Sequence, residues 1–269
     1  MQELPQKLKR LQFFVGNTPT IRLFCEIDGK NVDILAKYEA WNFSGSIKDR
    51  MAIQILKAAY MLGTLNPGDT IVEATSGNTG IAFAAMGAYL GHPVQIYMPS
   101  WLSVERKRLL RFYGAKLFEI TAKQGGFQKC IELADKKSAK NGFFGPKQFE
   151  NSWNVPDNNT DGSHRIEGIG DSFIPKIVNL QALSPIVRVN DANAINIARQ
   201  INKLGLSVGI SSGANVFGAI LKTLELGNNK NVGTILCDGN KKYLTTDLCS
   251  DSEEKLSEQI KILDFEIIA

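Results

Sequence analysis

The sequence predicts an α/β fold with mostly parallel sheets, large enough for two domains. Short apolar runs such as Ile34–Lys37 and Val94–Met98 alternate with amphipathic segments of helical length. Glycines stand where those helices should end, at Gly63, Gly91 and Gly114. At 269 residues the chain can bury one large core or two smaller ones.

The expected elements follow in chain order from this alternation. Strands are expected in the short apolar runs, at Ile34–Lys37, Thr70–Val72, Val94–Met98, Leu117–Ile120, Ile186–Val189 and Gly233–Cys237. Helices are expected in the longer periodic runs, from about Lys48 to Leu62 and at Ile81–Tyr89, Val104–Phe112, Phe127–Lys137, Ala192–Leu204 and Ser212–Leu224. The least regular stretch, Phe149–Asp171, is rich in turn-forming residues.

Composition excludes several classes of protein. Hydrophobic residues make up 43% and charged residues 22% of the chain, as in ordinary globular proteins. A net charge of +4 without a polybasic run argues against a nucleic-acid partner, and no apolar stretch reaches the length of a membrane span. The N-terminus lacks the apolar region of a signal peptide.

The cysteines and histidines indicate the compartment and exclude some chemistry. The four cysteines have no metal-ligand spacing and are typical of thiols in a reducing compartment, so we expect a cytoplasmic protein. The only histidines are His92 and His164, which gives little support for a metal site or a Ser–His triad. We expect His92 to lie in a turn between a helix and a strand.

Lys48 stands behind a Ser/Gly turn at the expected start of a helix. Ser46-Ile47-Lys48-Asp49 fits the Ser-x-x-acid capping pattern. The helix dipole disfavours a cation in the first turn and so lowers the pKa of the amine. A lysine that loses its proton more easily is a better nucleophile toward a carbonyl. The alternative is an ordinary surface lysine, because helix caps are common and reactive lysines are rare.

A second segment has the composition of an anion-binding turn. Thr75-Ser76-Gly77-Asn78-Thr79-Gly80 follows an expected strand and precedes an expected helix. This geometry points backbone N–H groups and hydroxyls at a carboxylate or a phosphate. The alternative is an N-capped turn without a ligand, but four hydrogen-bonding residues and two glycines exceed what a cap requires.

Several motifs occur together in an order that is characteristic of one family. They are Val15-Gly16-Asn17-Thr18-Pro19, Ser44-Gly45-Ser46-Ile47-Lys48-Asp49-Arg50, Thr75–Gly80 and Gly209-Ile210-Ser211-Ser212-Gly213-Ala214. Together they resemble the cysteine synthase (O-acetylserine sulfhydrylase) and cystathionine β-synthase family. Further segments that resemble this family are Met98-Pro99, Ser103–Lys107, Tyr113–Ala115, Gly168–Gly170 and Phe173–Pro175. The similarity runs from about Phe14 to Leu248.

The resemblance implies a fold and a cofactor. Members of this family are pyridoxal-phosphate enzymes of the tryptophan-synthase-β fold, also called fold type II, with two domains that meet at a cleft. By this resemblance residues 1–37 would be an N-terminal arm of the larger domain, residues 38–150 a smaller mobile domain carrying the substrate loop, and residues 151–269 the remainder of the larger domain. The cofactor would be pyridoxal 5'-phosphate, and no metal is expected.

The resemblance also assigns roles within this sequence. Lys48 matches the lysine that holds the cofactor and carries the Cα proton, and Asn78 matches the asparagine beside the ring oxygen of the cofactor. The residues matched to the substrate carboxylate are Thr75, Ser76, Thr79 and Gln148. Taken alone, Gln148 is more typical of a solvated polar residue at a strand end.

Ser211 matches the serine that faces the pyridine nitrogen of the cofactor. A neutral hydroxyl there leaves the nitrogen largely unprotonated, which suits elimination and replacement at Cβ. The alternative is that Ser211 or Ser212 caps a helix and Gly213 allows close packing.

One part of the family pattern is missing. Family members carry a Gly-Thr-Gly-Gly-Thr loop around the cofactor phosphate, and this chain has none; Asn154-Val155-Pro156 is the expected seam. Gly125-Gly126 lies in the expected smaller domain and cannot replace it. A phosphate carries about two negative charges and normally needs several backbone N–H groups. The explanations are a remodelled relative, a damaged or alternatively spliced product, or a sequence from which a segment was dropped.

The resemblance implies replacement or elimination at Cβ of a serine- or cysteine-like amino acid, of the cysteine synthase type, with a thiol or sulfide as nucleophile. A homodimer is the expected assembly, with no nucleic-acid or membrane partner. The alternative, which the missing loop supports, is a catalytically impaired relative that acts as a binding or regulatory subunit. An amino-acid deaminase of the same fold is a third alternative.

Overall fold

The computed structural model describes residues 4–151, 186–227, 230–250 and 259–268. The chain divides into two compact units, and each is described by itself. The first unit comprises Met1–Gly16 and Lys48–Leu183, and the second comprises Asn17–Ile47 and Ser184–Ala269. The predicted small mobile domain at 38–150 stays a prediction, because these units record packing and not motion.

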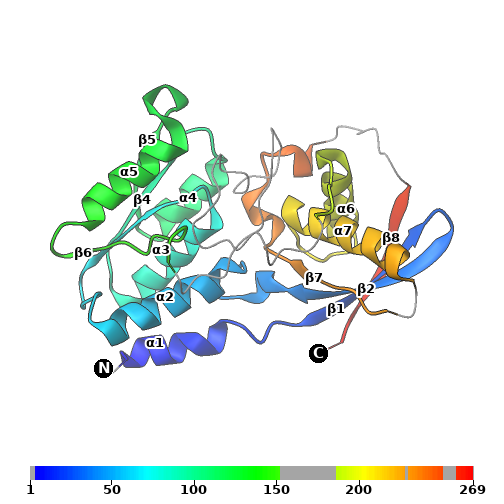
Figure 1. Ribbon diagram of the computed structural model, residues 1–269, viewed down its shortest axis with the longest axis horizontal. Helices are drawn as coiled ribbons and strands as arrows, with labels where there is room; N and C mark the ends of the chain where they lie inside the picture. The colour runs from blue at the N-terminus through cyan, green and yellow to red at the C-terminus, as the bar shows by residue number, and fades with distance from the viewer. Residues whose placement is uncertain (1–3, 152–185, 228–229, 251–258, 269) are drawn as a thin grey trace. The chain divides into compact units, whose positions relative to one another are not determined.

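The first unit contains a parallel four-stranded sheet. Its strands are β3 (Thr70–Ala74), β4 (Val94–Pro99), β5 (Lys116–Ile120) and β6 (Phe143–Phe144), in the order β5-β4-β3-β6 (Figure 1). All three strand pairs are parallel. Because β6 pairs with only Thr70 and Ile71, the following residues of β3 have no strand neighbour on that side among the described residues.

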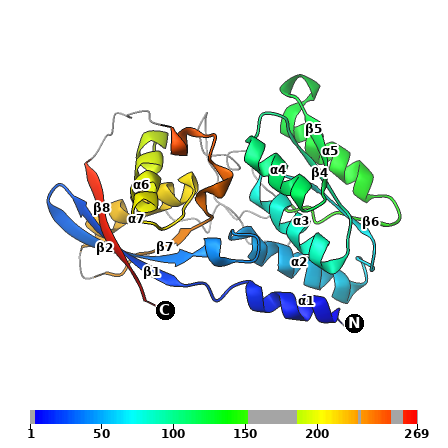
Figure 2. The same cartoon turned by 180° about the vertical axis from the view of Figure 1, so that it is seen from behind.

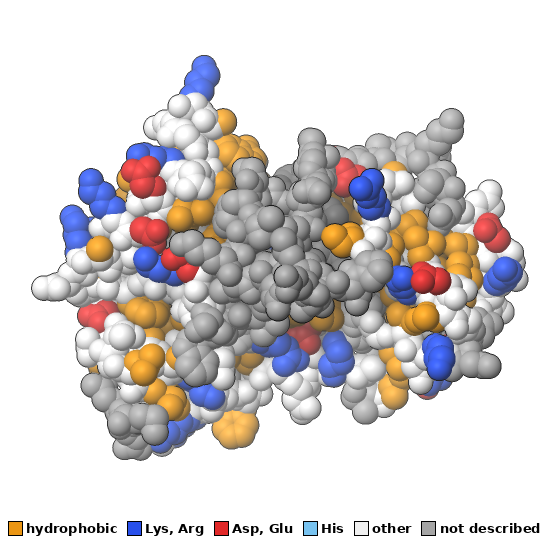
Figure 3. Space-filling model, viewed as in Figure 1, with side chains coloured by type: hydrophobic (Ala, Val, Ile, Leu, Met, Phe, Trp, Pro, Cys, Tyr) orange, Lys and Arg blue, Asp and Glu red, His pale blue; other side chains and the backbone are white. Residues whose placement is uncertain are grey.

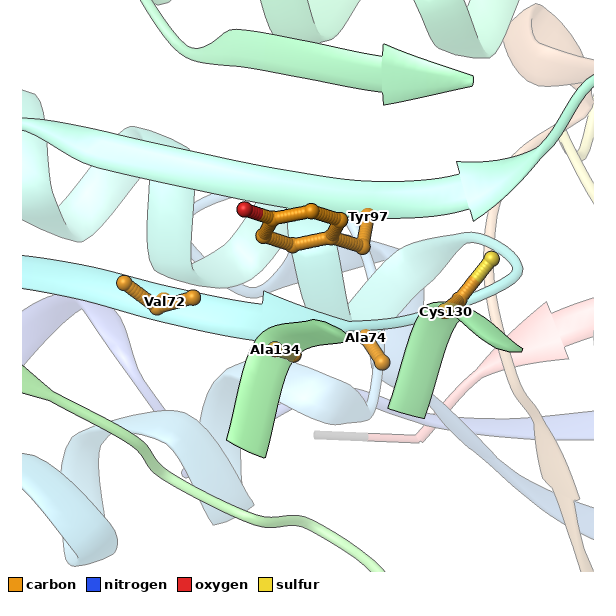
Figure 4. Packing of buried hydrophobic residues seen from close by; sticks show 5 residues of the cluster. All are labelled: Val72, Ala74, Tyr97, Cys130 and Ala134. Carbon is orange, nitrogen blue, oxygen red and sulfur yellow. The ribbon is translucent and has the colours of Figure 1, made fainter. Parts of the chain in front are cut away.

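Helices cover both faces of this sheet. The helices of the unit are α1 (Gln6–Leu11), α2 (Lys48–Leu62), α3 (Asn78–Leu90), α4 (Val104–Phe112) and α5 (Gly126–Ser138). Ile71 and Ile96 face α3, whose glycines approach their side chains. On the other face Val72, Ala74 and Tyr97 pack against α5 (Figure 4). Helices α2 and α3 lie side by side in both views (Figures 1 and 2).

The second unit has a mixed sheet in the order β7-β2-β1-β8. Its strands are β1 (Thr20–Ile27), β2 (Lys30–Tyr38), β7 (Gly233–Leu236) and β8 (Ile260–Ile267). β1 pairs antiparallel with β2 and β8, while β2 pairs parallel with β7. The hairpin between β1 and β2 turns at Asp28 and Gly29, whose φ angles of 49° and 74° are typical of a type I′ turn.

Two helices of the second unit pack against each other, α6 (Asp191–Lys203) and α7 (Ile210–Leu226). Their backbones approach most closely at Gly213, where a Cβ atom would lie 1.9 Å from the carbonyl oxygen of Ala194. Short 3-10 turns complete the described elements: η1 Gln12–Phe14, η2 Glu39–Trp41, η3 Ala122–Gln124, η5 Asn240–Lys242 and η6 Asp247–Cys249.

The α/β prediction is confirmed, and so is the position of most expected elements. Gly63, Gly91 and Gly114 have positive φ angles of 68°, 88° and 82°, as expected at the ends of helices. The expected strand at Ile186–Val189 is wrong, since the described residues there pair with no strand. Val187 lies beside α7 instead, near the position that a Cβ atom on Gly218 would take.

Candidate functional site

Lys48 is the first residue of α2, and its side chain is half-buried. Because α2 begins at Lys48, the prediction that a lysine opens this helix is confirmed. The next residue, Asp49, is fully buried, so one side of the first turn packs against the protein interior.

The predicted capping box at Ser46 is wrong. Ser46 forms an isolated antiparallel bridge with Asp238, and its fully buried hydroxyl has no hydrogen-bond partner among the residues that the structure describes. The N–H of Ile47 donates to the carbonyl oxygen of Cys237 at 2.9 Å. The chain therefore enters α2 from strand-like pairing, and Ser46 takes part in this pairing through its backbone instead of capping the helix with its hydroxyl.

The Thr75–Asn78 turn connects the end of β3 to the start of α3. Thr75 is buried; its N–H donates to the carbonyl oxygen of Tyr97 at 3.1 Å, and its hydroxyl oxygen accepts from the N–H of Gly77 at 3.1 Å. Ser76 and Asn78 are half-buried, and Asn78 is the first residue of α3. The turn is thus internally braced, with two polar side chains partly accessible at a helix N-terminus.

Arg106, which the sequence analysis did not single out, lies behind this turn. It is 1% exposed, and a Cβ atom on Gly77 would lie 3.2 Å from its Nε atom. Glycine at this position therefore lets a buried guanidinium approach the backbone of the turn.

Gln148 is held on this turn, although it is about 70 residues away in the sequence. Its Oε1 accepts from the hydroxyl of Thr79 at 2.6 Å, and its Nε2 donates to the carbonyl oxygen of Ala74 at 2.9 Å. It is 7% exposed, so the alternative of a solvated residue at a strand end is wrong. The structure brings Thr75, Thr79 and Gln148 together, with Ser76 and Asn78 on the same turn.

Glu73 braces the same region. Its two carboxylate oxygens accept from the N–H groups of Ala74 at 2.9 Å and Gln148 at 3.3 Å. Burial raises the pKa of Glu73 to about 8, outweighing these two hydrogen bonds, while Asp135 raises it further and Lys147 lowers it. The sequence feature that could have pointed to Glu73 is an acidic residue at the end of an apolar strand.

The stability of the protein should depend on pH through Glu73. Because its pKa is about 8 in the folded state against an ordinary 4.5, the folded state holds this proton more tightly than the unfolded state. Its stabilising contribution is complete below about pH 4.5 and is lost toward pH 8, at up to about 1.4 kcal/mol per pH unit. Glu73→Gln cannot ionise, so we expect a flatter profile of unfolding free energy in urea.

The matched control for this prediction is Glu132→Gln, an exposed glutamate on α5. It should keep the slope of the unchanged protein. If Glu73→Gln also keeps that slope, Glu73 is ionised throughout this pH range and the assigned pKa is wrong.

Ser211 lies in the first turn of α7 and is half-buried, in the second unit. The N-cap position of this helix is Gly209, and no side chain forms a capping hydrogen bond there. The alternative that Ser211 or Ser212 caps the helix is therefore wrong. The neighbouring Ser212 is fully buried and accepts a hydrogen bond from the N–H of Cys237 at 2.9 Å. Ser212 therefore serves the packing of α7 on β7, and Ser211 is the serine at the more accessible position.

The donor set fits the reactive end of pyridoxal phosphate. In the first unit, the amine of Lys48 and the amide of Asn78 have the chemistry to suit its aldehyde and its ring oxygen. In the second unit, the hydroxyl of Ser211 has the chemistry to suit its ring nitrogen. A glycine loop for the phosphate is absent from the described residues, and the seam at Asn154-Val155-Pro156 lies outside them. The pair Gly125-Gly126 starts α5, with φ angles of 109° and 55°.

Other kinds of site receive no support from the part of the chain that the structure describes. No group of three or more His, Cys, Asp or Glu residues there could hold a metal ion. Its helices include none with the length and apolarity needed to cross a membrane. On the face shown in Figure 3, the blue Lys and Arg side chains are dispersed among acidic ones and form no stripe over the coloured residues.

A parallel α/β unit in which a lysine opens one helix and a braced Thr-Ser-Gly-Asn turn opens another agrees with the enzymes that use pyridoxal phosphate on amino acids. Residues 11–160 match the family described as pyridoxal-phosphate dependent enzyme. The chain belongs to this family, and within it is a cysteine synthase-like transferase or lyase.

Curated relatives and a solved structure agree with this assignment. A cysteine synthase of Staphylococcus aureus (strain Mu50 / ATCC 700699) is 31% identical, with 88% of this chain and 95% of the relative covered. Cysteine synthase B of Campylobacter jejuni is 33% identical, with 89% and 98% covered. The crystal structure of a hydrogen sulfide-producing enzyme from Fusobacterium nucleatum is 37% identical, with a TM-score of 0.88 and coverage of 98% and 99%.

The relatives also show that this chain is shorter inside the matched region. The alignment to the Staphylococcus aureus enzyme spans 296 positions, more than the 269 residues of this chain. The relative therefore has residues that this chain lacks, which agrees with the predicted missing stretch.

Proposed function

We propose that this enzyme replaces or eliminates the Cβ substituent of a serine- or cysteine-like amino acid, with the cysteine synthase reaction as its main activity. In that reaction O-acetylserine and sulfide give cysteine and acetate. The observation that carries the proposal is the buried Gln148, held by Thr79 and Ala74 on the Thr75–Asn78 turn. Hydroxyls, an amide and a helix N-terminus gathered on one turn form a donor set for an α-carboxylate.

Lys48, Asn78 and Ser211 would hold the cofactor. When bound, pyridoxal phosphate supplies an electron sink for the bonds at Cα. The Lys48 amine would attach the cofactor and then act as the base that takes the Cα proton. The Asn78 amide would donate to the ring oxygen, and the Ser211 hydroxyl would face the ring nitrogen.

Thr75, Ser76, Thr79 and Gln148 would orient the substrate. The Thr75 hydroxyl oxygen accepts from Gly77, and its single hydrogen can donate to a carboxylate. Fixing the carboxylate fixes the direction of the Cα–H bond, which determines how well a base can reach it.

A second candidate is the release of hydrogen sulfide from cysteine. It is favoured by the Fusobacterium nucleatum structure, which has higher identity to this chain than the two cysteine synthases described above.

One assay distinguishes these two activities. Cysteine alone should release sulfide if elimination dominates, whereas O-acetylserine with sulfide should yield cysteine if replacement dominates. A colourless protein inactive in both would favour the binding-subunit alternative, and release of ammonia and a keto acid would favour a deaminase.

The carboxylate assignment is tested by Gln148→Leu. Loss of a hydrogen bond to a charged group costs about 1.5–3 kcal/mol, so KM for the amino acid should rise roughly 10- to 100-fold with a smaller change in kcat. The decarboxylated amine lacks the carboxylate charge, so it should bind the unchanged protein and Gln148→Leu equally weakly. Gln128→Leu, on the exposed face of α5, is the control. An unchanged KM in Gln148→Leu would remove Gln148 from the substrate site.

We further propose a homodimer in a reducing compartment such as the cytoplasm, with a role in cysteine biosynthesis. The side chains of Phe13 and Phe14, which follow α1, are 87% and 65% exposed and offer an apolar surface to a second copy. The structure pairs none of the four cysteines, all of which lie in its described part, in a disulfide. That supports a reducing environment.

A further inference from the structure

The three residues before Lys48 belong to the second unit and all contact one short stretch of the same unit, Cys237–Lys242. The N–H of Ile47 donates to the carbonyl oxygen of Cys237 at 2.9 Å, and Ser46 forms a β-bridge with Asp238. The ammonium group of Lys242 donates to the carbonyl oxygen of Gly45 at 3.2 Å. These contacts, two between backbone groups and one from the Lys242 side chain, fix the backbone immediately before Lys48.

Lys242 is unusual because it is 5% exposed. Its Nζ lies 3.9 Å from Oδ2 of Asp238, and the hydroxyl of Tyr243 donates to the same oxygen at 2.9 Å. Asp238 and Tyr243 are also buried. A buried ion pair adds little net stability compared with apolar residues of similar volume, so a gain in stability does not by itself account for this pair.

The segment just before α2 has an unusual backbone and a hydroxyl that is unpartnered within the described part of the chain. Gly45 has a left-handed φ of 87°, and the Ser46 hydroxyl caps no N–H group among the described residues. The contact between Lys242 and Gly45 lies three residues before Lys48.

We propose that Lys242 is a positioning residue for Lys48. Its ammonium group holds the carbonyl of Gly45 and so fixes the backbone of Gly45–Ile47, the segment that is covalently joined to Lys48. This rests on the proposed function of Lys48 as the residue that attaches pyridoxal phosphate. The chemistry required of Lys242 is hydrogen-bond donation from a cation, so arginine should substitute for it better than methionine.

The test compares Lys242→Met with Lys241→Met, its exposed neighbour. The first measurement is amide hydrogen exchange of the cofactor-free protein, read at the N–H groups of Gly45 and Ile47. The second is the rate of borohydride trapping of pyridoxal phosphate on Lys48. We expect Lys242→Met to speed exchange at these amides about tenfold and to slow trapping. Lys241→Met should match the unchanged protein, and Lys242→Arg should restore most of both properties.

A second variant separates positioning from folding. Lys242→Met could unfold the protein by leaving the buried Asp238 carboxylate without its cation. The double variant Asp238→Asn with Lys242→Met removes both charges and still lacks the contact with Gly45, so it should show the same fast exchange.

Two outcomes would contradict different claims. Exchange at Gly45 and Ile47 that is unchanged in both Lys242 variants would overturn the positioning role. Trapping that persists in Lys48→Ala would instead contradict the proposed function, whatever the exchange rates show.

Discussion

Replacing Lys48 with alanine is expected to abolish covalent attachment of pyridoxal phosphate. Alanine has no amine to react with the cofactor aldehyde or to take the Cα proton, and loss of a positioned base alone costs about 10²- to 10⁴-fold in rate. After borohydride reduction, mass mapping should find the cofactor on Lys48 in the unchanged protein and no label at position 48 in the variant. Turnover should fall by at least the same factor.

Lys57→Ala is the matched control, because Lys57 is a half-buried lysine on the same helix. It should keep the label and the activity. A Lys48→Ala protein that turns over at the rate of the unchanged protein would remove the central assignment of the site.

Gly213→Ala is expected to have the largest effect on stability. A Cβ atom at Gly213 would lie 1.9 Å from the carbonyl oxygen of Ala194 and 2.8 Å from the backbone nitrogen of Ala198. These are backbone atoms of α6, so the two helices would have to move apart. Overpacking typically costs about 1–3 kcal/mol, and a clash with backbone atoms puts this variant at the upper end; denaturant unfolding measures the cost directly.

Gly218→Ala provides the control within the same helix. The nearest atom to a Cβ there is Cγ1 of Val187 at 3.9 Å, an ordinary contact. Since alanine favours a helix over glycine by about 1 kcal/mol, this variant should equal or exceed the stability of the unchanged protein. Equal stability of both alanine variants would mean that α6 and α7 pack less closely than the structure shows.

Local sequence signals predicted the elements of the first unit well. The helix Val104–Phe112 has the predicted bounds, and Gly91 ends α3 in the left-handed conformation that glycine tolerates. Apolar periodicity and glycine position depend on neighbouring residues, so they can be read from the chain. The Asp28-Gly29 pair was also a readable hairpin signal, although β1 was not predicted.

The contacts that define the site could not be read in this way. Gln148 meets Thr79 and Ala74 only because the chain returns to the open side of β3 after β6. Glu73, Arg106 and Lys242 also depend on partners distant in sequence or on burial. The Ser46 cap failed for the same reason, since pairing with Asp238 replaced the local pattern.

The pairing of β1 with β8 has a consequence for how the protein is made. The sheet of the second unit is complete only after residues 260–267 have been synthesised and have paired with residues 20–27. The parallel sheet of the first unit needs only residues 70–144, so it can form while the ribosome is still translating. Until then the unpaired edge of β1 is an open template for pairing with other chains, which is an aggregation hazard during synthesis.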